Sequence, residues 1–257
     1  MVFANGSLGL KVMQLLLDSS DIQVVGVVLN HQDKISEGYK DMFLKLSSEN
    51  GIDCEFFQFS ENLWEQTRFL QVMRSADYAV SALFGHIIPL NVISHFGEKI
   101  VNLHPSLLPT GRGADPVAWA IIEDKQQGAT LHQVDGNIDT GNVLKQIQIE
   151  THFSDTAGEI YSRCLEALLE LFKQYLASDL NHLEKKPPDS RGTYHNRKEL
   201  DAIRESLLRG NKEFEHVLRI VQALSYSDGR RARLKLQNGQ VWEVSISARL
   251  VLEQDDQ

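Results

Sequence analysis

Two polar side chains separated by one residue, Asn102 and His104, stand at the end of an apolar run and before a loop rich in Pro and Gly. Alternate residues of a strand point to one face, so a strand that ends here presents the amide and the imidazole together. Open α/β sheets place ligands and chemistry at the carboxyl ends of their strands. For these two residues alone, a capped strand end with a surface histidine is the simpler interpretation.

A carboxylate, Asp139, completes a set of groups that could transfer an acyl group to an amine. It lies in the polar turn at 135–141, between strand-like segments at 129–134 and 143–149 that predict a hairpin. Acyl transfer needs a donor for the developing oxyanion, a base for the amine and a carboxylate that orients the base. Spacing does not show that the three groups meet, and Asp139 as a plain turn residue remains an alternative.

Composition narrows the class of protein. The chain has 257 residues, of which 42% are hydrophobic and 24% charged, as in soluble globular proteins with a sizeable core. A net charge of −9 without a basic run predicts no nucleic-acid partner. No apolar segment approaches about 18 residues and the start does not resemble a signal peptide, so no membrane association is expected.

The cysteines point to the cytoplasm. Cys54 and Cys164 lie far apart without metal-ligand spacing. This usage predicts buried thiols in a reducing compartment, hence a cytoplasmic protein, and no metal site.

Strand-like and helical segments alternate along most of the chain. The alternation predicts an α/β fold, a Rossmann-like, mostly parallel sheet with helices on both faces. The expected strands are at 2–4, 22–29, 54–59, 78–83, 100–103, 129–134 and 143–149, and the expected helices are at 8–17, 40–48, 63–73, 116–123 and 155–176. Asp115 is the expected N-cap of the fourth helix.

A charged, Pro-rich stretch at 184–192 predicts a linker. It divides the chain into a catalytic domain, residues 1–183, and a linker with a small C-terminal subdomain, residues 184–257. That subdomain is expected to hold helices at 198–208 and 213–224 and a β-hairpin at 231–246 that turns at Asn238-Gly239. The edge of the hairpin favours a homodimer, although such edges are often simply covered.

Two further loops offer backbone N–H groups to a ligand. Asn5, Gly6 and Ser7 link the first strand to a helix, and this turn could hold a phosphate or serve only as a helix cap. The apolar loop at 84–89 contains Gly85, which permits close backbone approach. That loop suits the edge of a flat aromatic ligand or a packed turn.

Three motifs, at 102–109, 128–133 and 138–146, together resemble the 10-formyltetrahydrofolate-dependent formyltransferase family. The resemblance covers most of residues 1–180. It implies a Rossmann-like domain in which an Asn-His-Asp triad moves a formyl group from the folate to a primary amine. On this resemblance Asn102 stabilises the oxyanion, His104 is the general base or proton carrier, and Asp139 orients His104 and relays protons through water.

The resemblance also implies binding residues. Those expected to hold 10-formyltetrahydrofolate are Leu83, Phe84, Gly85, His86, Ile87, Asp135, Gly136 and Ile138. Those expected to contact the acceptor are Asn5, Gly6, Ser7, Ser106, Arg112, His132 and Tyr194. Alternatives remain open for three of these: a solvated charge for Arg112, a satisfied core histidine for His132, and packing of the C-terminal segment for Tyr194. His31 and His195 are expected to be structural, and a structural role is the alternative for His86.

The C-terminal segment carries the inference about the acceptor. Its sequences at 192–195 and 198–201 look like those of bacterial enzymes that formylate dTDP-linked amino-dideoxy sugars. This implies transfer to a 3- or 4-amino group of such a sugar nucleotide, for surface polysaccharide such as the O-antigen of lipopolysaccharide. The alternatives are a glycinamide ribonucleotide formyltransferase, a methionyl-tRNA formyltransferase, and an inactive folate- or sugar-nucleotide-binding module.

Overall fold

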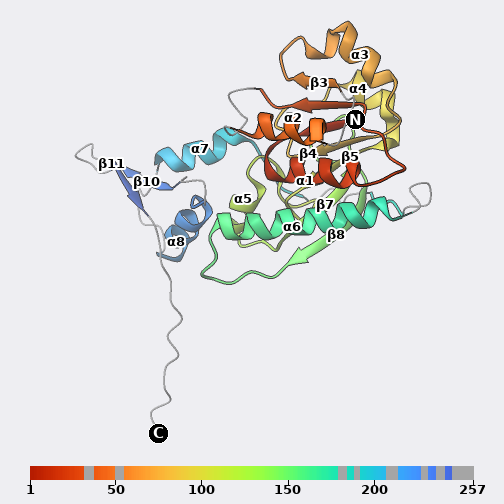
Figure 1. Ribbon diagram of the computed structural model, residues 1–257. Helices are drawn as coiled ribbons and strands as arrows, with labels where there is room; N and C mark the ends of the chain where they lie inside the picture. The colour runs from red at the N-terminus through yellow and green to blue at the C-terminus, as the bar shows by residue number, and fades with distance from the viewer. Residues whose placement is uncertain are drawn as a thin grey trace.

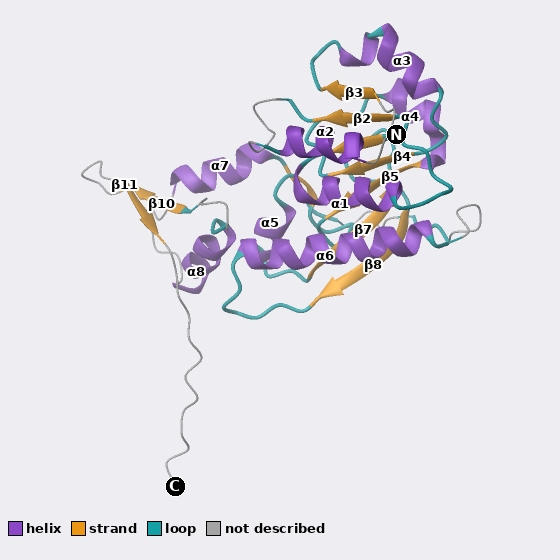
Figure 2. Ribbon diagram, in the orientation of Figure 1, coloured by secondary structure: helices purple, strands orange, loops and turns teal. Residues whose placement is uncertain are grey.

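The computed structural model describes residues 1–31, 38–49, 55–178, 184–187, 192–206, 214–226, 231–235 and 241–244. Its centre is a seven-stranded sheet with the order β3-β2-β1-β4-β5-β7-β8 (Figures 1 and 2). The strands are β1 (Val2–Ala4), β2 (Gly26–Leu29), β3 (Glu55–Gln58), β4 (Ala79–Ala82), β5 (Ile100–His104), β7 (Gln127–Gln133) and β8 (Val143–Ile149). The first five are parallel, and β7 and β8 are antiparallel additions.

Helices cover both faces of this sheet, which confirms the predicted fold class (Figure 1). On one face lie α1 (Gly6–Leu17), α2 (Tyr39–Glu49) and α6 (Ala157–Leu176), whose buried side chains share a core with β1 and β5. On the other face α3 (Thr67–Arg74) and α4 (Leu90–Phe96) pack in a second core. Such double coverage buries both faces of β2 and β4, as parallel sheets require.

The sequence of the longest helix, α6, explains where the helix begins and which face it buries. Its start is a capping box in which Thr156 accepts from the Glu159 N–H and the Glu159 carboxylate accepts from the Thr156 N–H. Cys164, Leu168 and Phe172 recur at helical spacing and are buried. This apolar stripe fixes the helix against the sheet, as the periodicity predicts.

Several predicted boundaries are wrong. The strand expected from residue 22 begins at Gly26, and the helix expected at 63–73 is a 3-10 turn, η2 (Leu63–Glu65), followed by α3. The extended conformation of Gln66 separates these two pieces. Helix α4 was not predicted, because its seven residues follow Pro89 in a stretch that looks like an apolar loop. Asp115 precedes α5 (Pro116–Ile122) in a left-handed conformation and its side chain forms no cap hydrogen bond.

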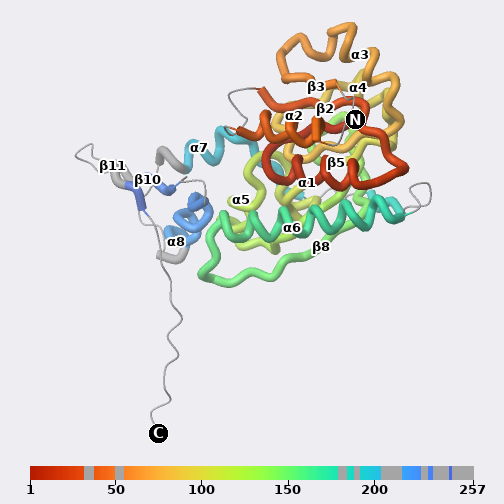
Figure 3. Tube along the Cα trace, in the orientation of Figure 1, coloured from red at the N-terminus to blue at the C-terminus, as the bar shows by residue number. Residues whose placement is uncertain are grey.

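The C-terminal elements lie beside α5 and one end of α6 (Figure 3). They are β9 (Tyr194–His195), α7 (Arg197–Ser206), α8 (Phe214–Ala223), β10 (Ala232–Lys235) and β11 (Val241–Val244). Leu200, Ile220 and Leu224 share an apolar cluster with Val117 and Ile160. These two residues belong to the part of the chain that contains the seven-stranded sheet, residues 1–178, which we call the main domain. β9 pairs in parallel with β6 (Arg112–Gly113), so the C-terminal segment contacts the loop that follows β5.

The remaining predictions concern the C-terminal hairpin, the domain boundary, membrane association and partners. β10 and β11 pair as expected, but the predicted turn at Asn238-Gly239 and the boundary at residue 183 lie outside the described residues. Within the described ranges no helix is both long and apolar enough to cross a membrane. The homodimer, the cytoplasmic location and the lack of a nucleic-acid partner stay predictions.

Candidate active site

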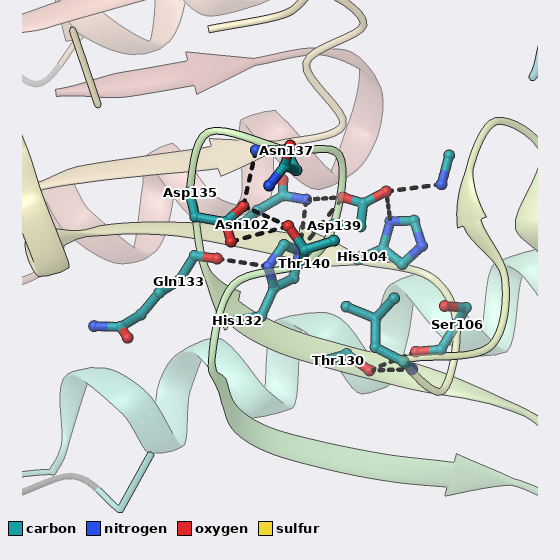
Figure 4. A network of polar contacts seen from close by, with 12 residues as sticks. Asn102, His104, Ser106, Thr130, His132, Gln133, Asp135, Asn137, Asp139 and Thr140 are labelled. Carbon is teal, nitrogen blue, oxygen red and sulfur yellow. Dashed lines mark hydrogen bonds and ion pairs between the residues drawn. The ribbon is translucent and has the colours of Figure 1, made fainter. Parts of the chain in front are cut away.

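The register of the sheet brings two predicted site residues side by side. Asn102 lies on β5 and pairs directly with His132 on the antiparallel strand β7, while His104 ends β5. The Asn102 amide Nδ2 lies 3.1 Å from His132 Nε2 (Figure 4). The antiparallel addition of β7 to a parallel sheet therefore places a second imidazole at the site, which spacing along the chain does not show.

Asp139 completes the cluster from the tip of the β7–β8 hairpin. It has φ 53°, a left-handed conformation that is uncommon for a residue with a side chain. Its Oδ1 accepts from Asn102 Nδ2 at 3.5 Å, and its Oδ2 lies 3.7 Å from His104 Nδ1 (Figure 4). The structure thus brings together the three residues that sequence analysis could place only on separate segments.

The carboxylate of Asp139 is ionised despite its burial. Its side chain is 12% exposed, and burial alone favours the neutral acid. The positive charge that His104 carries when protonated, the protonated form of His132 and the Gly113 N–H, 2.9 Å from Oδ2, outweigh burial and hold the pKa of Asp139 well below its ordinary value. The site therefore holds a fixed negative charge beside two imidazoles.

The hydrogen bonds of His104 determine which ring nitrogen is available for chemistry. Nε2 lies 2.8 Å from the carbonyl oxygen of Gly111. A carbonyl can only accept, so Nε2 carries the proton in the neutral ring. Nδ1 is then the basic nitrogen, and it faces Asp139 at a distance too long for a hydrogen bond. This arrangement leaves one atom of a buried imidazole able to take up a proton.

His132 is a satisfied core histidine that also orients the amide of Asn102. Its Nδ1 donates to the carbonyl oxygen of Gln133 at 2.7 Å, and its side chain is 2% exposed. Nε2 is consequently an acceptor, and it receives one N–H of Asn102. The amide nitrogen of Asn102 is thereby fixed on the side of His132 and Asp139.

The loop predicted to hold the pterin is only partly open. Phe84 and His86 pack with other aromatic rings, and His86 stacks on Phe59 with 3.6 Å between ring centroids. Gly85 donates its N–H to Asn30 Oδ1 at 2.9 Å. Leu83, which precedes this loop, has φ 59°. The side-chain amide of Asn30 is a support of this loop that the sequence did not indicate.

Three exposed apolar side chains mark the same edge of the sheet. Ile87, Leu90 and Ile138 are 76%, 64% and 42% exposed. Leu90 lies against Gly136, because a Cβ at that glycine would be 2.9 Å from Leu90 Cδ2. We call Ile87, Leu90 and Ile138 the apolar rim. The sequence did not point to Leu90, because α4 was not predicted. A single leucine in a sequence of ordinary hydrophobicity gives no sign that its side chain is exposed.

The hairpin turn is held by Asp135. Its carboxylate accepts from Thr140 Oγ1 at 2.7 and 2.9 Å and from the Asn137 N–H at 3.1 Å (Figure 4). The predicted ligand contact of Asp135 would have to come in addition to this role in the turn.

The residues expected to contact the acceptor fall into two groups. Asn5, Gly6 and Ser7 begin α1 after β1, where Asn5 Oδ1 is buried without a hydrogen-bond partner and Gly6 has φ 59°. Ser106 lies after β5, is 4% exposed and donates to the Thr110 carbonyl at 2.9 Å. The first group thus offers one free polar atom, Asn5 Oδ1, whereas the hydroxyl of Ser106 already has an acceptor.

Arg112 and Tyr194 lie side by side where β6 pairs with β9. The Arg112 guanidinium makes only long contacts, 3.4 and 3.5 Å, with the carbonyl oxygens of Gly192 and Thr193. It forms no ion pair within the described residues. Tyr194 is 47% exposed and its ring lies against Gly113. Both side chains therefore border the backbone that binds Asp139.

Other polar groups have structural roles. In the part of the chain that the structure describes, no cluster of three or more His, Cys, Asp or Glu side chains could hold a metal ion. Cys164 is buried, its Sγ contacts the Gly128 carbonyl at 3.3 Å, and burial raises the pKa of its thiol to about 12. Cys54 lies outside the described residues.

Comparison with known proteins identifies the family. The model of the formyl transferase family matches residues 1–176, which include β1 to β8 and the whole polar cluster. The chain belongs to the formyl transferase family. The dTDP-4-amino-4,6-dideoxyglucose formyltransferase of Mycobacterium bovis is 28% identical over 156 residues. The match covers 60% of the chain and 63% of that enzyme, so it spans less than two thirds of the relative's length.

Solved structures extend the likeness in fold to the C-terminal elements. A sugar N-formyltransferase from Shewanella sp FDAARGOS_354 aligns over 98% of both chains, with a TM-score of 0.81 and 20% identity. An N-formyltransferase from Helicobacter canadensis, in complex with folinic acid and dTDP-3-aminofucose, aligns over 88% of this chain and 80% of that one. Its TM-score is 0.69 and its identity 21%.

Proposed function

We propose that the protein is an N-formyltransferase that moves a formyl group from 10-formyltetrahydrofolate to the primary amine of a sugar nucleotide. The observation that carries the proposal is the position of Asp139, whose two carboxylate oxygens face Asn102 and His104 at the carboxyl edge of the sheet. Membership of the formyl transferase family supports the reaction type.

In the proposed reaction the acceptor amine attacks the formyl carbon, so the nitrogen loses a proton and the formyl oxygen gains negative charge. His104 takes this proton at Nδ1, because Nε2 is already bound to the Gly111 carbonyl. The adjacent carboxylate of Asp139 stabilises the imidazolium that forms. His104 then gives the proton to the folate nitrogen as the bond between that nitrogen and the formyl carbon breaks and the formyl C=O re-forms, which restores the neutral ring.

Asn102 supplies the donor for the oxygen. Its two amide N–H groups face His132 at 3.1 Å and Asp139 at 3.5 Å. The second contact is at the long limit for a hydrogen bond, so it is the one that the formyl oxygen replaces as charge develops. The hydrogen bond to His132 keeps the amide in place throughout.

The formyl donor, 10-formyltetrahydrofolate, supplies an activated formyl group on a nitrogen that lies between a reduced pterin and an aromatic ring. The apolar rim offers the exposed hydrophobic contacts that such a ring needs. We assign its binding to Leu83, Phe84, Gly85, His86 and Ile87 of the loop after β4, and to Asp135, Gly136 and Ile138 of the hairpin turn. Leu90 of the rim joins them.

For the acceptor we propose a dTDP-linked amino-dideoxy sugar with its amine at position 3 or 4, used for surface polysaccharide. Arg112, which has no ion-pair partner in the described chain, suits the diphosphate. The exposed ring of Tyr194 suits the base. The buried, unpartnered Oδ1 of Asn5 supports a polar contact at the start of α1, with Gly6 and Ser7. The likeness in fold of the C-terminal elements to a sugar N-formyltransferase favours this acceptor class.

A panel of acceptors tests the proposal. Purified protein with 10-formyltetrahydrofolate is expected to formylate dTDP-linked 3- or 4-amino sugars and to leave glycinamide ribonucleotide and charged initiator tRNA unmodified. Turnover only with the ribonucleotide or the tRNA would overturn the sugar acceptor. No turnover with any acceptor, together with binding of folate or sugar nucleotide, would instead support an inactive binding module.

The rate should also depend on pH. The amine and His104 must both be unprotonated for attack, so kcat/KM is expected to fall as the medium becomes acidic. Initial rates measured from roughly pH 5 to 8 check this, because ordinary imidazoles change charge in that range. A flat profile would contradict proton transfer at the limiting step.

A further inference from the structure

Residues 192–195, which lie 88 positions or more beyond His104 in the sequence, run alongside the loop that contacts the catalytic side chains. We call residues 192–195 the C-terminal strap. We propose that the strap is a positioning element of the active site, which fixes His104 and Asp139 through the backbone of residues 111–113. This inference rests on the proposed function, since it assigns a role in that reaction.

One peptide group, between Gly111 and Arg112, links the strap to His104. Its C=O accepts from His104 Nε2 at 2.8 Å, and its N–H donates to the Thr193 carbonyl at 3.0 Å. The strap therefore binds the N–H of the peptide group whose C=O binds the ring of His104. Hydrogen bonds linked through one peptide group also polarise each other, which strengthens both.

Thr193 makes a second bond to the same loop. Its hydroxyl Oγ1 accepts from the Gly111 N–H at 2.8 Å. Gly111 has φ 74°, so its backbone lies in a region that most residues avoid and that its neighbours must hold. Both peptide groups that flank Gly111 are thus bound to Thr193.

The contact with Asp139 depends on the next residue of the loop. The Gly113 N–H donates to Asp139 Oδ2 at 2.9 Å. Gly113 lies between two bonds to the strap, from the Arg112 N–H to the Thr193 carbonyl and from the Ala114 N–H to the His195 carbonyl at 2.9 Å. The strap thereby fixes the N–H that faces the Asp139 carboxylate.

The approach of the two segments is close enough to require glycine. A Cβ at Gly113 would lie 2.2 Å from the His195 carbonyl oxygen, and one at Gly192 would lie 1.9 Å from the Pro109 carbonyl oxygen. Such short distances leave no space for a side chain, so the strap and the loop are a fitted backbone interface. The strap has little freedom to shift along the loop.

The strap is itself anchored by His195. The ring stacks on Trp119 of α5, with 3.7 Å between centroids and 8° between planes. Its Nε2 lies 2.7 Å from Glu123 Oε1, and its Nδ1 lies 2.8 Å from Glu199 Oε2. α5 belongs to the main domain and α7 to the C-terminal elements, so His195 joins the two at the end of the strap.

The pair Thr193→Val and Thr193→Ser tests the proposal in the full chain. Valine has nearly the shape of threonine but cannot accept the Gly111 N–H, whereas serine keeps the hydroxyl. We expect Thr193→Val to lower kcat about 10-fold with little change in KM. A misplacement of ~1 Å costs about 100-fold in rate, so a smaller displacement of His104 gives a loss of this size. Thr193→Ser should recover most of this loss.

Arg219→Ala provides the matched control. It removes the ion pair of Arg219 with Asp124, which also joins α8 to the main domain but does not touch the strap. We expect it to lower the melting temperature without changing kcat. A Thr193→Val enzyme that is less stable but has the wild-type kcat per folded molecule would overturn the positioning role.

Histidine ring signals in two-dimensional NMR give a readout that needs no turnover. The signals of His104, assigned by their loss in His104→Gln, should move in Thr193→Val and return in Thr193→Ser. An active wild type with unmoved signals in Thr193→Val would overturn this inference. An inactive wild type whose His104 signals do move would overturn the proposed function and show only that the strap positions the His104 ring.

Discussion

His104 and His195 both lie near carboxylates, and their surroundings differ. His195 has both ring nitrogens within 2.7 and 2.8 Å of carboxylate oxygens, and one face of its ring is covered by Trp119. His104 has one nitrogen bound to a carbonyl at 2.8 Å, while the other lies 3.7 Å from Asp139. Both rings are largely buried.

The difference fits the proposed roles, in which His195 is structural and His104 is the base. At His195 both ring nitrogens make short hydrogen bonds to carboxylate oxygens, which can only accept, so loss of a proton would break a contact that joins two parts of the fold. At His104 the loose contact leaves Nδ1 able to accept a proton, and Asp139 is close enough to stabilise the resulting charge. Residue types alone do not distinguish the two, because each is a histidine near an acid.

The largest effect should come from His104 itself. His104→Gln removes the base, and kcat is expected to fall about 10³-fold, within the range for general acid-base catalysis. Steady-state rates and thermal melting check this, with the exposed His152→Gln as the control that keeps wild-type kcat. A His104→Gln enzyme that retains turnover would show that the chemical histidine lies elsewhere.

Asp139→Asn should have the next largest effect. It keeps the shape of the side chain but removes the charge that stabilises the imidazolium, so we expect a fall in kcat of about 100-fold. Rates measured beside those of His104→Gln check the order of the two effects. Full activity in Asp139→Asn would leave the carboxylate with no part in the reaction.

The same variant tests the ionisation of Asp139. Its depressed pKa means that the carboxylate stabilises the fold above the unfolded pKa of about 4. This contribution is lost as the pH falls through the lower folded value. The difference in unfolding free energy between wild type and Asp139→Asn, from denaturant titrations, should therefore be largest near neutral pH and shrink below about pH 4. A difference that grows towards acid pH would contradict the ionised carboxylate.

His195→Ala is expected to lower kcat less than His104→Gln or Asp139→Asn does, and to lower the unfolding free energy more. Loss of the ring leaves Glu123 and Glu199 without this partner and uncovers Trp119, so we expect a loss of about 2 kcal/mol in unfolding free energy. Because His195 anchors the strap, kcat should fall about 10-fold or less. Chemical denaturation and rate measurements check both. A fall in rate as large as that of His104→Gln would break the distinction between the two histidines.

Substitution of Cys164 should not change kcat. Burial raises the pKa of its thiol to about 12, so the reactive thiolate is scarce at neutral pH. Alkylation with peptide mapping should label Cys164 only after denaturant is added, and Cys164→Ala should keep the wild-type kcat. Rapid labelling of Cys164 in the native protein would contradict its burial.

Local patterns were enough for most of the fold. Apolar β-branched runs gave strands such as β2, and the stripe along α6 gave the long helix, because both patterns report which faces are buried. Short elements with irregular starts, such as α4 after Pro89, lack enough periodicity to be recognised. The break at Gln66 depends on one backbone conformation, and no composition signal marks it.

For the site, the amino-acid sequence identifies the groups that are present: the amide and imidazole two residues apart at a strand end, the acid at a hairpin tip, and the motifs that resemble a formyltransferase. Which of these groups meet depends on the tertiary fold. The antiparallel pairing of β7 with β5 places His132 beside Asn102, and the left-handed backbone of Asp139 turns its carboxylate towards both.

The role of the C-terminal strap also required the structure. Its contacts are backbone hydrogen bonds between segments about 80 residues apart, and almost any side chains could accompany such bonds. Sequence patterns report side-chain chemistry and burial, whereas the orientation of His104 depends on the peptide group between Gly111 and Arg112. The sequence therefore determined the chemistry, and the folding of a distant segment onto the loop decided its geometry.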